Sequence, residues 1–157
     1  MKNIKNVLFV CTGNSCRSIM AEAYLEKRAK EEGLDIKVES AGTLGIDGME
    51  PTKEAWQMIK SEGIESTDYV SAGLNHDLVE WADVILVMER MHKDRVSFMI
   101  PDAATKVKYL REFSGESEEK TEIPDPIGRP VRFYKKCFEM IKRSVNGFID
   151  EIKKGAE

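Results

Sequence analysis

One stretch decides how this chain folds: VLFVCTGNSCRS, residues 7–18. Its first four residues are apolar and predict a short buried strand, and a helical pattern begins near Ser15. The segment from Cys11 to Arg17 therefore lies on a strand-to-helix turn. Backbone N–H groups and a helix N-terminus create positive potential at such a turn, which favours both a thiolate and a bound phosphate. The stretch predicts an oxyanion-binding loop directly after the first strand.

Outward from this stretch, short apolar runs alternate with longer segments of helical periodicity. This alternation is typical of parallel strands joined by crossover helices, so the sequence predicts an α/β fold. The predicted strands cover residues 7–10, 36–38, 84–88 and 107–110. The predicted helices cover residues 15–32, 52–61, 77–81 and 131–152, and the polar residues 114–121 predict an exposed loop.

The composition favours a single domain over residues 1–157. A chain of 157 residues with 41% hydrophobic content can bury one core, whereas two cores would be cramped. Its 24 basic and 28 acidic residues give a net charge of −4, which predicts no binding to nucleic acid. The first apolar run is too short for a signal peptide or a membrane span, so we expect a cytoplasmic protein without membrane insertion. Three cysteines make a poor disulfide framework, and we expect reduced thiols.

The loop contains the groups that phosphoryl transfer to sulfur requires. We interpret Cys11 as the nucleophile and expect N–H dipoles and the neighbouring Arg17 guanidinium to lower its pKa. Arg17 offers a planar fork of donors that can clamp two phosphoryl oxygens. Ser18 can donate a hydrogen bond to the cysteine sulfur and so stabilise it as nucleophile and as leaving group.

The residues between the cysteine and the arginine are predicted to cradle the phosphate, mainly through backbone amides. Gly13 permits dihedral angles that are closed to other residues, and Asn14 tolerates the left-handed region that a tight anion-binding turn often needs. The predicted phosphate-binding residues are Thr12, Gly13, Asn14, Ser15, Cys16 and Arg17.

The reaction also needs a proton donor for the leaving group and later a base for water. Asp125 in Ile123-Pro124-Asp125-Pro126 is the best candidate, because flanking prolines stiffen a turn that can hold one carboxylate over a pocket. Asp and Pro also populate ordinary turns. Asp102 is the competing acid; it follows Pro101 but lacks a second flanking proline, so it ranks below Asp125.

Four motifs, in this order along the chain, resemble the low-molecular-weight protein tyrosine phosphatases: VCTGNSCRS (10–18), MAE (20–22), SAG (40–42) and DP (125–126). The resemblance spans nearly the whole chain. It implies a three-layer domain in which helices flank a four-stranded parallel sheet. It also implies a phosphocysteine intermediate on Cys11, phosphate binding by Arg17 and general acid catalysis by Asp125, with no metal or cofactor.

The same resemblance assigns supporting roles to residues around the loop. It implies that Asn14 and Ser40 hold the phosphate loop through hydrogen bonds, a role that Ser18 shares through the sulfur. Cys16 matches a second cysteine that can form a protective disulfide with the nucleophile. A buried packing thiol on the first helical turn is an equally good interpretation of Cys16.

The expected substrate is a phosphorylated protein or peptide, with inorganic phosphate as the product. Relatives that hydrolyse phosphotyrosine often carry aromatic residues where this chain has residues 44–46 (LGI) and Ile127-Gly128, so its walls lack the stacking energy of an aromatic pair. Protein arginine phosphatases, a related bacterial branch, favour Thr at the position of Ser15. Ile19 replaces a proline usual in both branches, and Asp68 stands near a position often held by His.

Three other functions fit less well. Thioredoxin-linked arsenate reductases need two further cysteines, and Cys137 in the last predicted helix is interpreted as a packing residue. A non-catalytic phosphate-binding module would gain nothing from an oxidisable thiol at Cys11. A zinc site lacks a second ligand pair, and His76 and His92 are expected to be solvated or at helix ends.

Two basic clusters are candidates for guiding a macromolecular substrate. One comprises Arg90, Lys93 and Arg95, after the third predicted strand, and the other comprises Arg129 and Arg132 beside Asp125. Solvated surface charge is the simpler interpretation of both. At the rim of a pocket, however, the second pair would favour acidic residues around a phosphorylation site.

Overall fold

In the computed structural model, which describes residues 3–155, four parallel strands form one sheet in the order β2-β1-β3-β4. The strands are β1 (Asn6–Cys11), β2 (Lys37–Gly42), β3 (Val84–Val87) and β4 (Val107–Tyr109). The predicted α/β class is confirmed. The second strand ends at Gly42 rather than at residue 38, because Ala41 and Gly42 continue the pairing of β2 with Val10 and Cys11.

Five α-helices accompany the sheet: α1 (Arg17–Glu31), α2 (Lys53–Ser61), α3 (His76–Trp81), α4 (Arg90–Met99) and α5 (Val131–Gly155). Two 3₁₀ segments, η1 (Pro101–Lys106) and η2 (Leu110–Phe113), flank β4. The first helix begins at Arg17 rather than at Ser15, because the backbone before it, up to Cys16, forms the loop. The sequence pattern does not predict α4. Only His92 and Val96 are buried in this helix, so its sequence lacks the wide apolar face from which an amphipathic helix is recognised.

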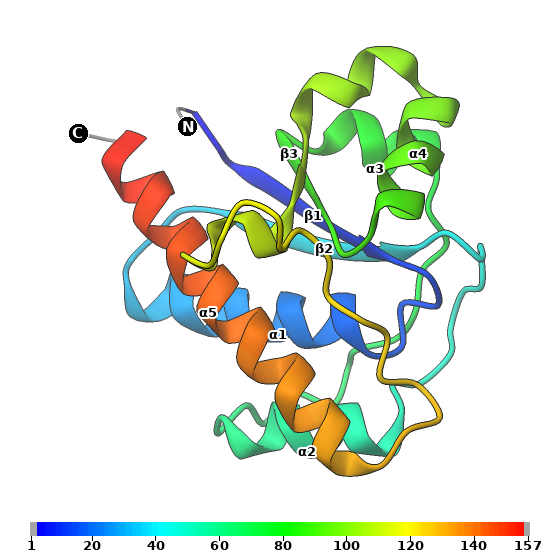
Figure 1. Ribbon diagram of the computed structural model, residues 1–157, viewed down its shortest axis with the longest axis vertical. Helices are drawn as coiled ribbons and strands as arrows, with labels where there is room; N and C mark the ends of the chain where they lie inside the picture. Colours follow the sequence, from blue (N-terminus) through cyan, green and yellow to red (C-terminus); the bar gives the residue numbers. More distant parts are fainter. Residues whose placement is uncertain (1–2, 156–157) are drawn as a thin grey trace.

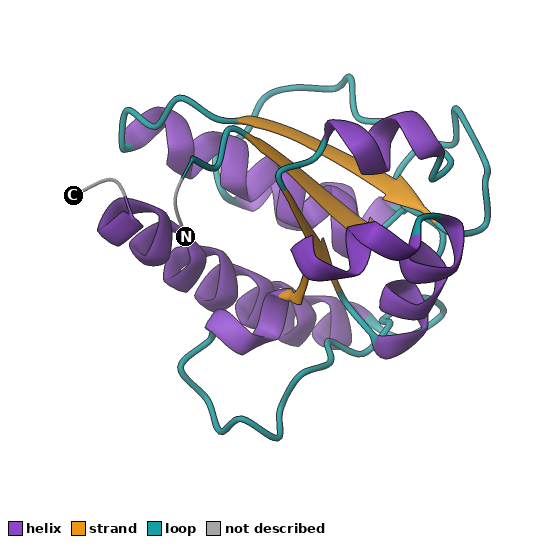
Figure 2. Cartoon of the chain, turned by 90° about the horizontal axis from the view of Figure 1, so that it is seen from above, coloured by secondary structure: helices purple, strands orange, loops and turns teal. Residues whose placement is uncertain are grey.

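The helices cover both faces of the sheet. Figure 1 shows α1, α2 and α5 on one side and α3 and α4 on the other, and Figure 2 shows the strands between these layers. Alternation along β1 divides its side chains between two cores. Val7, Phe9 and Cys11 pack in the core that includes α1 and α5, whereas Leu8 and Val10 pack in the core that includes α3 and α4.

The longest helix, α5, is held against the rest of the chain at a point of very close approach. A Cβ atom at Gly147 would collide with the carbonyl oxygen of Phe113 in η2. The Phe113 ring also packs edge-to-face on Phe148, with 5.3 Å between ring centroids. This contact holds the C-terminal half of α5 against η2.

Because all four strands are parallel, their carboxyl ends lie at one edge of the sheet, where open α/β sheets bind ligands. The loop after β1, the segment after β2 and the start of α4 all meet at this edge. The Ile123 N–H donates to the Met88 carbonyl at 2.9 Å and so ties the segment before α5 to the end of β3. Within residues 3–155, no helix has the length and apolar character needed to cross a membrane.

Candidate active site

A cavity of about 170 Å³ opens at the carboxyl edge of the sheet. It brings the cysteine loop together with the distant Asp125 segment, so the three predicted catalytic residues share one cavity. Asn14 does not line it. The lining residues are Cys11, Thr12, Gly13, Ser15, Cys16, Arg17, Leu44, Asp125 and Ile127.

The backbone of the loop is turned so that its carbonyl groups are bound outside the cavity. The carbonyl oxygens of Cys11 and Thr12 accept from the N–H groups of Thr43 and Leu44, at 2.9 and 3.0 Å. The Ser15 carbonyl accepts from the Thr52 N–H at 3.1 Å. Since N–H and C=O groups of one peptide point in opposite directions, the N–H side of these peptides is left for an anion.

The Cys11 thiol is buried at the centre of the loop and lies within hydrogen-bond distance of two groups. Its Sγ lies 3.3 Å from the Asn14 backbone nitrogen and 2.9 Å from the Ser18 Oγ. Burial raises the pKa of this thiol, while the Arg17 guanidinium and the contacts with Ser18 and Asn14 lower it without offsetting burial. The expectation of a lowered pKa is therefore wrong for the unliganded protein, because it omitted the desolvation of a fully buried sulfur.

Asn14 stabilises the loop through side-chain hydrogen bonds and does not line the cavity. It adopts a left-handed backbone, with φ 55°, as its residue type predicted. Its Oδ1 accepts from the Ala72 N–H at 2.8 Å, which fixes the orientation of the amide. Its Nδ2 then donates to the hydroxyls of Ser18 and Ser40, at 2.6 and 2.9 Å. Because the Ser18 oxygen accepts from Asn14, its own proton is free for the Cys11 sulfur.

The glycine that the loop requires is Gly42 rather than Gly13. Gly13 has no positive φ, and a Cβ there would meet only the Ser15 Oγ at an ordinary 3.5 Å. A Cβ at Gly42 would lie 2.7 Å from the Thr12 carbonyl oxygen and 3.0 Å from the Asn14 nitrogen. The end of β2 therefore packs directly on the loop backbone, which a larger residue would push out of place.

The Arg17 guanidinium is buried and held by groups from two distant segments, Glu89 after β3 and residues 123–125. Its Nη1 donates to the Glu89 carboxylate and, at 2.8 Å, to the Ile123 carbonyl oxygen. Its Nη2 faces Asp125 Oδ2 at 3.5 Å. Sequence reasoning missed Glu89, although its position directly after β3, at the same edge as Cys11, was a usable signal.

Asp125 lies at the mouth of the cavity with 38% of its side chain exposed. Its Oδ1 accepts from the Ile127 N–H at 3.0 Å, which holds the carboxylate in a turn, while Oδ2 faces Arg17. The competing acid, Asp102, is exposed in η1 and does not line the cavity. The structure thus supports the preference for Asp125.

The sequence interpretation expected His92 to be solvated or at a helix end, and only the second half is confirmed: His92 lies in the first turn of α4 but is not solvated. It is fully buried near the start of α4, and its Nε2 lies 2.9 Å from the Thr12 hydroxyl oxygen. Burial and the nearby Arg17 charge lower its pKa to about 4, against a smaller opposing effect of Asp125. His76, in contrast, is exposed at the first position of α3, as expected.

The other two cysteines are buried and free. Cys16 Sγ contacts the Thr52 hydroxyl at 3.5 Å and the Tyr134 hydroxyl at 3.6 Å, so it packs between α2 and α5 as well as lining the cavity. Cys137 lies in α5 outside this cavity, and burial raises its pKa to about 12, as suits a packing thiol.

Ser40 connects the loop support to a buried carboxyl group. Its hydroxyl accepts from Asn14 and donates to Glu22 Oε1 at 2.6 Å. Burial, together with the charges of Glu26 and Glu39, raises the pKa of Glu22 to about 8 despite the bond from Ser40. The support of the loop therefore ends on a carboxyl group that changes charge near neutral pH.

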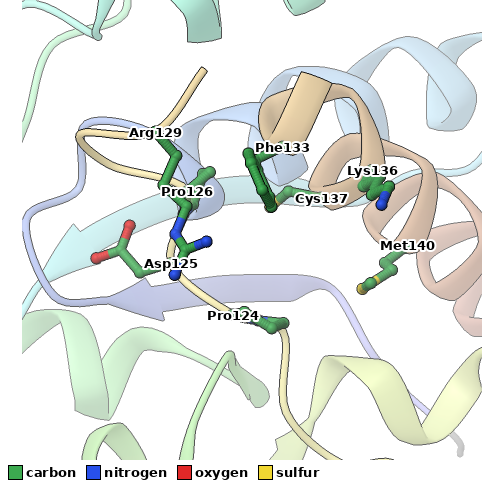
Figure 3. A pocket seen from close by; sticks show the side chains of 8 residues that line it. All are labelled: Pro124, Asp125, Pro126, Arg129, Phe133, Lys136, Cys137 and Met140. Carbon is green, nitrogen blue, oxygen red and sulfur yellow. The ribbon is translucent and has the colours of Figure 1, made fainter. Parts of the chain in front are cut away.

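A second cavity, of about 270 Å³, lies between the Asp125 segment and the first turns of α5 (Figure 3). Asp125 lines both cavities, and the second has an apolar wall that includes Pro124, Phe133 and Met140. Basic side chains gather on the Phe133 ring at its edge, with Arg129, Arg132 and Lys136 at 4.8, 5.0 and 5.8 Å from the ring centroid.

The family model described as "Low molecular weight phosphotyrosine protein phosphatase" matches residues 6–157. A protein-arginine-phosphatase from Geobacillus stearothermophilus is 32% identical over 146 residues, which are 93% of this chain and 95% of that protein.

Two solved structures have the same fold. A low molecular weight protein tyrosine phosphatase from T. tengcongensis is 34% identical, with a TM-score of 0.86 over 94% of this chain and 99% of the other. A cysteine-to-serine mutant of the arginine phosphatase YwlE, described with a phosphorylated active-site serine, is 31% identical, with a TM-score of 0.87 over 95% and 96%. The chain therefore belongs to the low molecular weight phosphotyrosine protein phosphatase family, and it is a hydrolase.

Proposed function

We propose that this protein hydrolyses phosphotyrosine in phosphorylated proteins through a phosphocysteine intermediate on Cys11. One observation carries the proposal: the Cys11 sulfur, the Arg17 guanidinium and the Asp125 carboxyl group converge on one cavity. Its wall is a loop whose carbonyl groups are bound outside, which leaves the opposite backbone N–H groups for an anion. Arg17 and these amides would hold the phosphoryl oxygens, and Glu89 would hold Arg17 from its other side.

In the first step, the Cys11 sulfur attacks phosphorus, the P–O bond to tyrosine breaks, and Asp125 gives its proton to the leaving oxygen. The nucleophile is the thiolate, although burial favours the thiol in the unliganded protein. We infer that the thiol proton passes to the phosphate dianion as it binds, since this transfer creates a thiolate without adding net charge to a buried site.

In the second step, water attacks the phosphocysteine and Asp125, now a carboxylate, takes a proton from it. The P–S bond breaks, inorganic phosphate leaves, and the Cys11 thiolate is again stabilised by Ser18 and the Asn14 N–H. The phosphorylated serine described in the YwlE mutant supports a covalent intermediate at the matching position. Each step uses only the residues of this chain and water, with no metal or cofactor.

The second candidate substrate is phosphoarginine in proteins. The Ser15 hydroxyl lies in the cavity wall, at the position where arginine phosphatases favour Thr, and a 32% identical relative is a protein-arginine-phosphatase. Leu44 and Ile127, which are 61% and 54% exposed at the cavity, form aliphatic walls that suit an alkyl stem as well as a ring.

The deciding experiment measures phosphate release, in reducing buffer without added metal, from a phosphotyrosine peptide and from a phosphoarginine protein. Wild type is compared with Cys11→Ser. We expect turnover of phosphotyrosine that the mutant loses, and a preference for phosphoarginine would select the second candidate. If wild type binds phosphate but releases none from either substrate, the hydrolytic mechanism is wrong and a binding module becomes the better interpretation.

We further propose a cytoplasmic location and a substrate with acidic residues near the phosphorylation site. The location is supported by three free thiols, of which Cys11 must stay reduced to react. The acidic preference is supported by Arg129 and Arg132, which lie beside the Asp125 segment without a carboxylate partner among residues 3–155. With a net charge of −4, the chain as a whole offers no attraction for nucleic acid.

A further inference from the structure

His92 touches the cysteine loop, yet no step of the proposed reaction uses it. It comes from α4, on the opposite side of the sheet from α1, and reaches the loop at the Thr12 hydroxyl. The hydrogen bond at His92 Nδ1 determines which of the two ring nitrogens carries the proton. The Glu89 backbone N–H donates to His92 Nδ1 at 3.1 Å, and a backbone N–H can only donate.

It follows that Nδ1 carries no proton and that the neutral ring carries its proton on Nε2. A neutral ring is also what burial and the Arg17 charge favour. His92 Nε2 therefore donates to the Thr12 Oγ1, which lies 2.9 Å away. The Thr12 oxygen is therefore the acceptor of this hydrogen bond, and the hydroxyl proton remains available for another acceptor.

A second donor approaches the same oxygen. Arg17 Nη2 lies 3.5 Å from the Thr12 Oγ1, so His92 and Arg17 occupy both acceptor positions of the hydroxyl. The hydroxyl proton must then point elsewhere. Within the described part of the chain, residues 3–155, no hydrogen bond from this proton is formed, and Thr12 lines the active-site cavity.

We propose that the Thr12 hydroxyl donates a hydrogen bond to a phosphoryl oxygen of the substrate, and that His92 is the positioning residue that directs it. This inference rests on the proposed function, because it assigns the phosphate to this cavity. The hydroxyl adds a side-chain donor to the backbone amides and Arg17. Its direction is set before the substrate binds, so little ordering is needed when the phosphoryl group arrives.

The test is an equilibrium titration of inorganic phosphate by calorimetry, which requires no turnover. Thr12→Val keeps the shape of the side chain and removes the donor, and we expect it to weaken phosphate binding about tenfold, as for a hydrogen bond to a charged group. Thr12→Ser keeps the hydroxyl and should bind phosphate nearly as wild type does. Thr105→Val, at an exposed threonine of η1, is the matched control and should change nothing.

The role of His92 is tested by a double-mutant cycle. His92→Phe should weaken phosphate binding severalfold when Thr12 is present and have no further effect in Thr12→Val. His92→Gln should restore binding, because its amide N–H can take the place of Nε2–H. Thermal unfolding of each variant shows whether it is folded.

Two results would overturn the proposal: unchanged phosphate affinity in Thr12→Val, or an equal effect of His92→Phe with and without the threonine hydroxyl. The second result would give His92 a packing role only. The proposed reaction is tested by a different measurement, the turnover of phosphorylated substrates by wild type and by Cys11→Ser. A wild type that binds phosphate through Thr12 but releases none from phosphorylated substrates would refute the hydrolysis and leave this inference standing.

Discussion

The cysteine loop and the Asp125 segment line the same cavity but are held in opposite ways. Cys11, Arg17 and Ser18 are buried, and they form hydrogen bonds with Thr43, Glu89 and Asn14 respectively. Asp125 is partly exposed in a turn that is tied to the sheet through Ile123. In the proposed reaction, the loop presents fixed dipoles to a phosphoryl group, whereas Asp125 exchanges protons with the leaving group and water.

The strongest test of the loop removes its nucleophile. Cys11→Ser should lower turnover by more than about 10⁴-fold, because a serine hydroxyl in the same place is a far weaker nucleophile, while phosphate binding persists. Steady-state kinetics measures the loss of turnover, and calorimetry measures the phosphate binding that should persist. Cys137→Ser, which also alters a buried thiol but lies outside the cavity, should retain activity. Equal losses in the two variants would contradict the assignment.

The corresponding test of the exposed segment removes the acid. Asp125→Asn should lower kcat on a phosphotyrosine peptide by about 10²- to 10³-fold, since the leaving group then departs without its proton. The loss should be smaller on p-nitrophenyl phosphate, whose leaving group needs less protonation. Asp102→Asn, the competing acid in η1, should be indistinguishable from wild type in the same assay.

The rigidity of the loop can be weakened without touching a reacting group. Gly42→Ala places a Cβ 2.7 Å from the Thr12 carbonyl and should lower kcat/KM about tenfold and the free energy of unfolding by about 1–3 kcal/mol. Gly13→Ala, with ordinary space for a Cβ, is the comparison and should be the more stable of the two. Denaturant unfolding and steady-state kinetics of both variants test this prediction. If Gly13→Ala were the less stable of the two, the packing argument would be refuted.

The pH dependence of stability reports on the support behind the loop. Because the pKa of Glu22 is raised to about 8 in the folded state, protonated Glu22 stabilises the fold at low pH. This stabilisation is lost as pH rises from about 4.3, the usual value for Glu, to about 8, with a slope of up to ~1.4 kcal/mol per pH unit.

Glu22→Gln should remove this dependence and unfold at higher denaturant concentration than wild type at pH 8.5, with little difference at pH 4.5. Glu118→Gln, at an exposed carboxylate of the loop before α5, should leave the curve unchanged. Denaturant titrations at several pH values make the measurement. Parallel curves for wild type and Glu22→Gln would show that the pKa of Glu22 is not raised in the folded state.

The smallest expected effect concerns the charged rim of the Asp125 segment. Arg129→Glu should raise KM about threefold for a phosphopeptide with acidic flanks, as for an exposed ion pair, and the effect should shrink in high salt. A peptide with alanine flanks should not respond. Arg90→Glu, at an exposed position of α4, is the charge-matched control. Equal responses to both peptides would remove the acidic preference.

Much of the active site could be predicted from local sequence. The run from Val7 to Ser18 sets a strand, a turn and a helix start side by side, and each depends on neighbours in the chain. Cys11, Arg17 and Ser18 could therefore be assigned from spacing and residue type. The α/β class followed from the alternation of apolar runs and helical patterns, and the structure confirms it.

What the sequence alone did not determine lies where distant segments meet. Glu89 and His92 belong to no motif of the cysteine loop, and they reach the loop only because β3 pairs beside β1 and ends at the same edge. The need for glycine at position 42 likewise arises from the pairing of β2 with β1. The pKa values of Cys11 and Glu22 depend on burial by the assembled layers. The residue types that perform the chemistry were readable locally, whereas their orientation and charge were decided by tertiary packing, since hydrogen bonding and desolvation depend on neighbours in space.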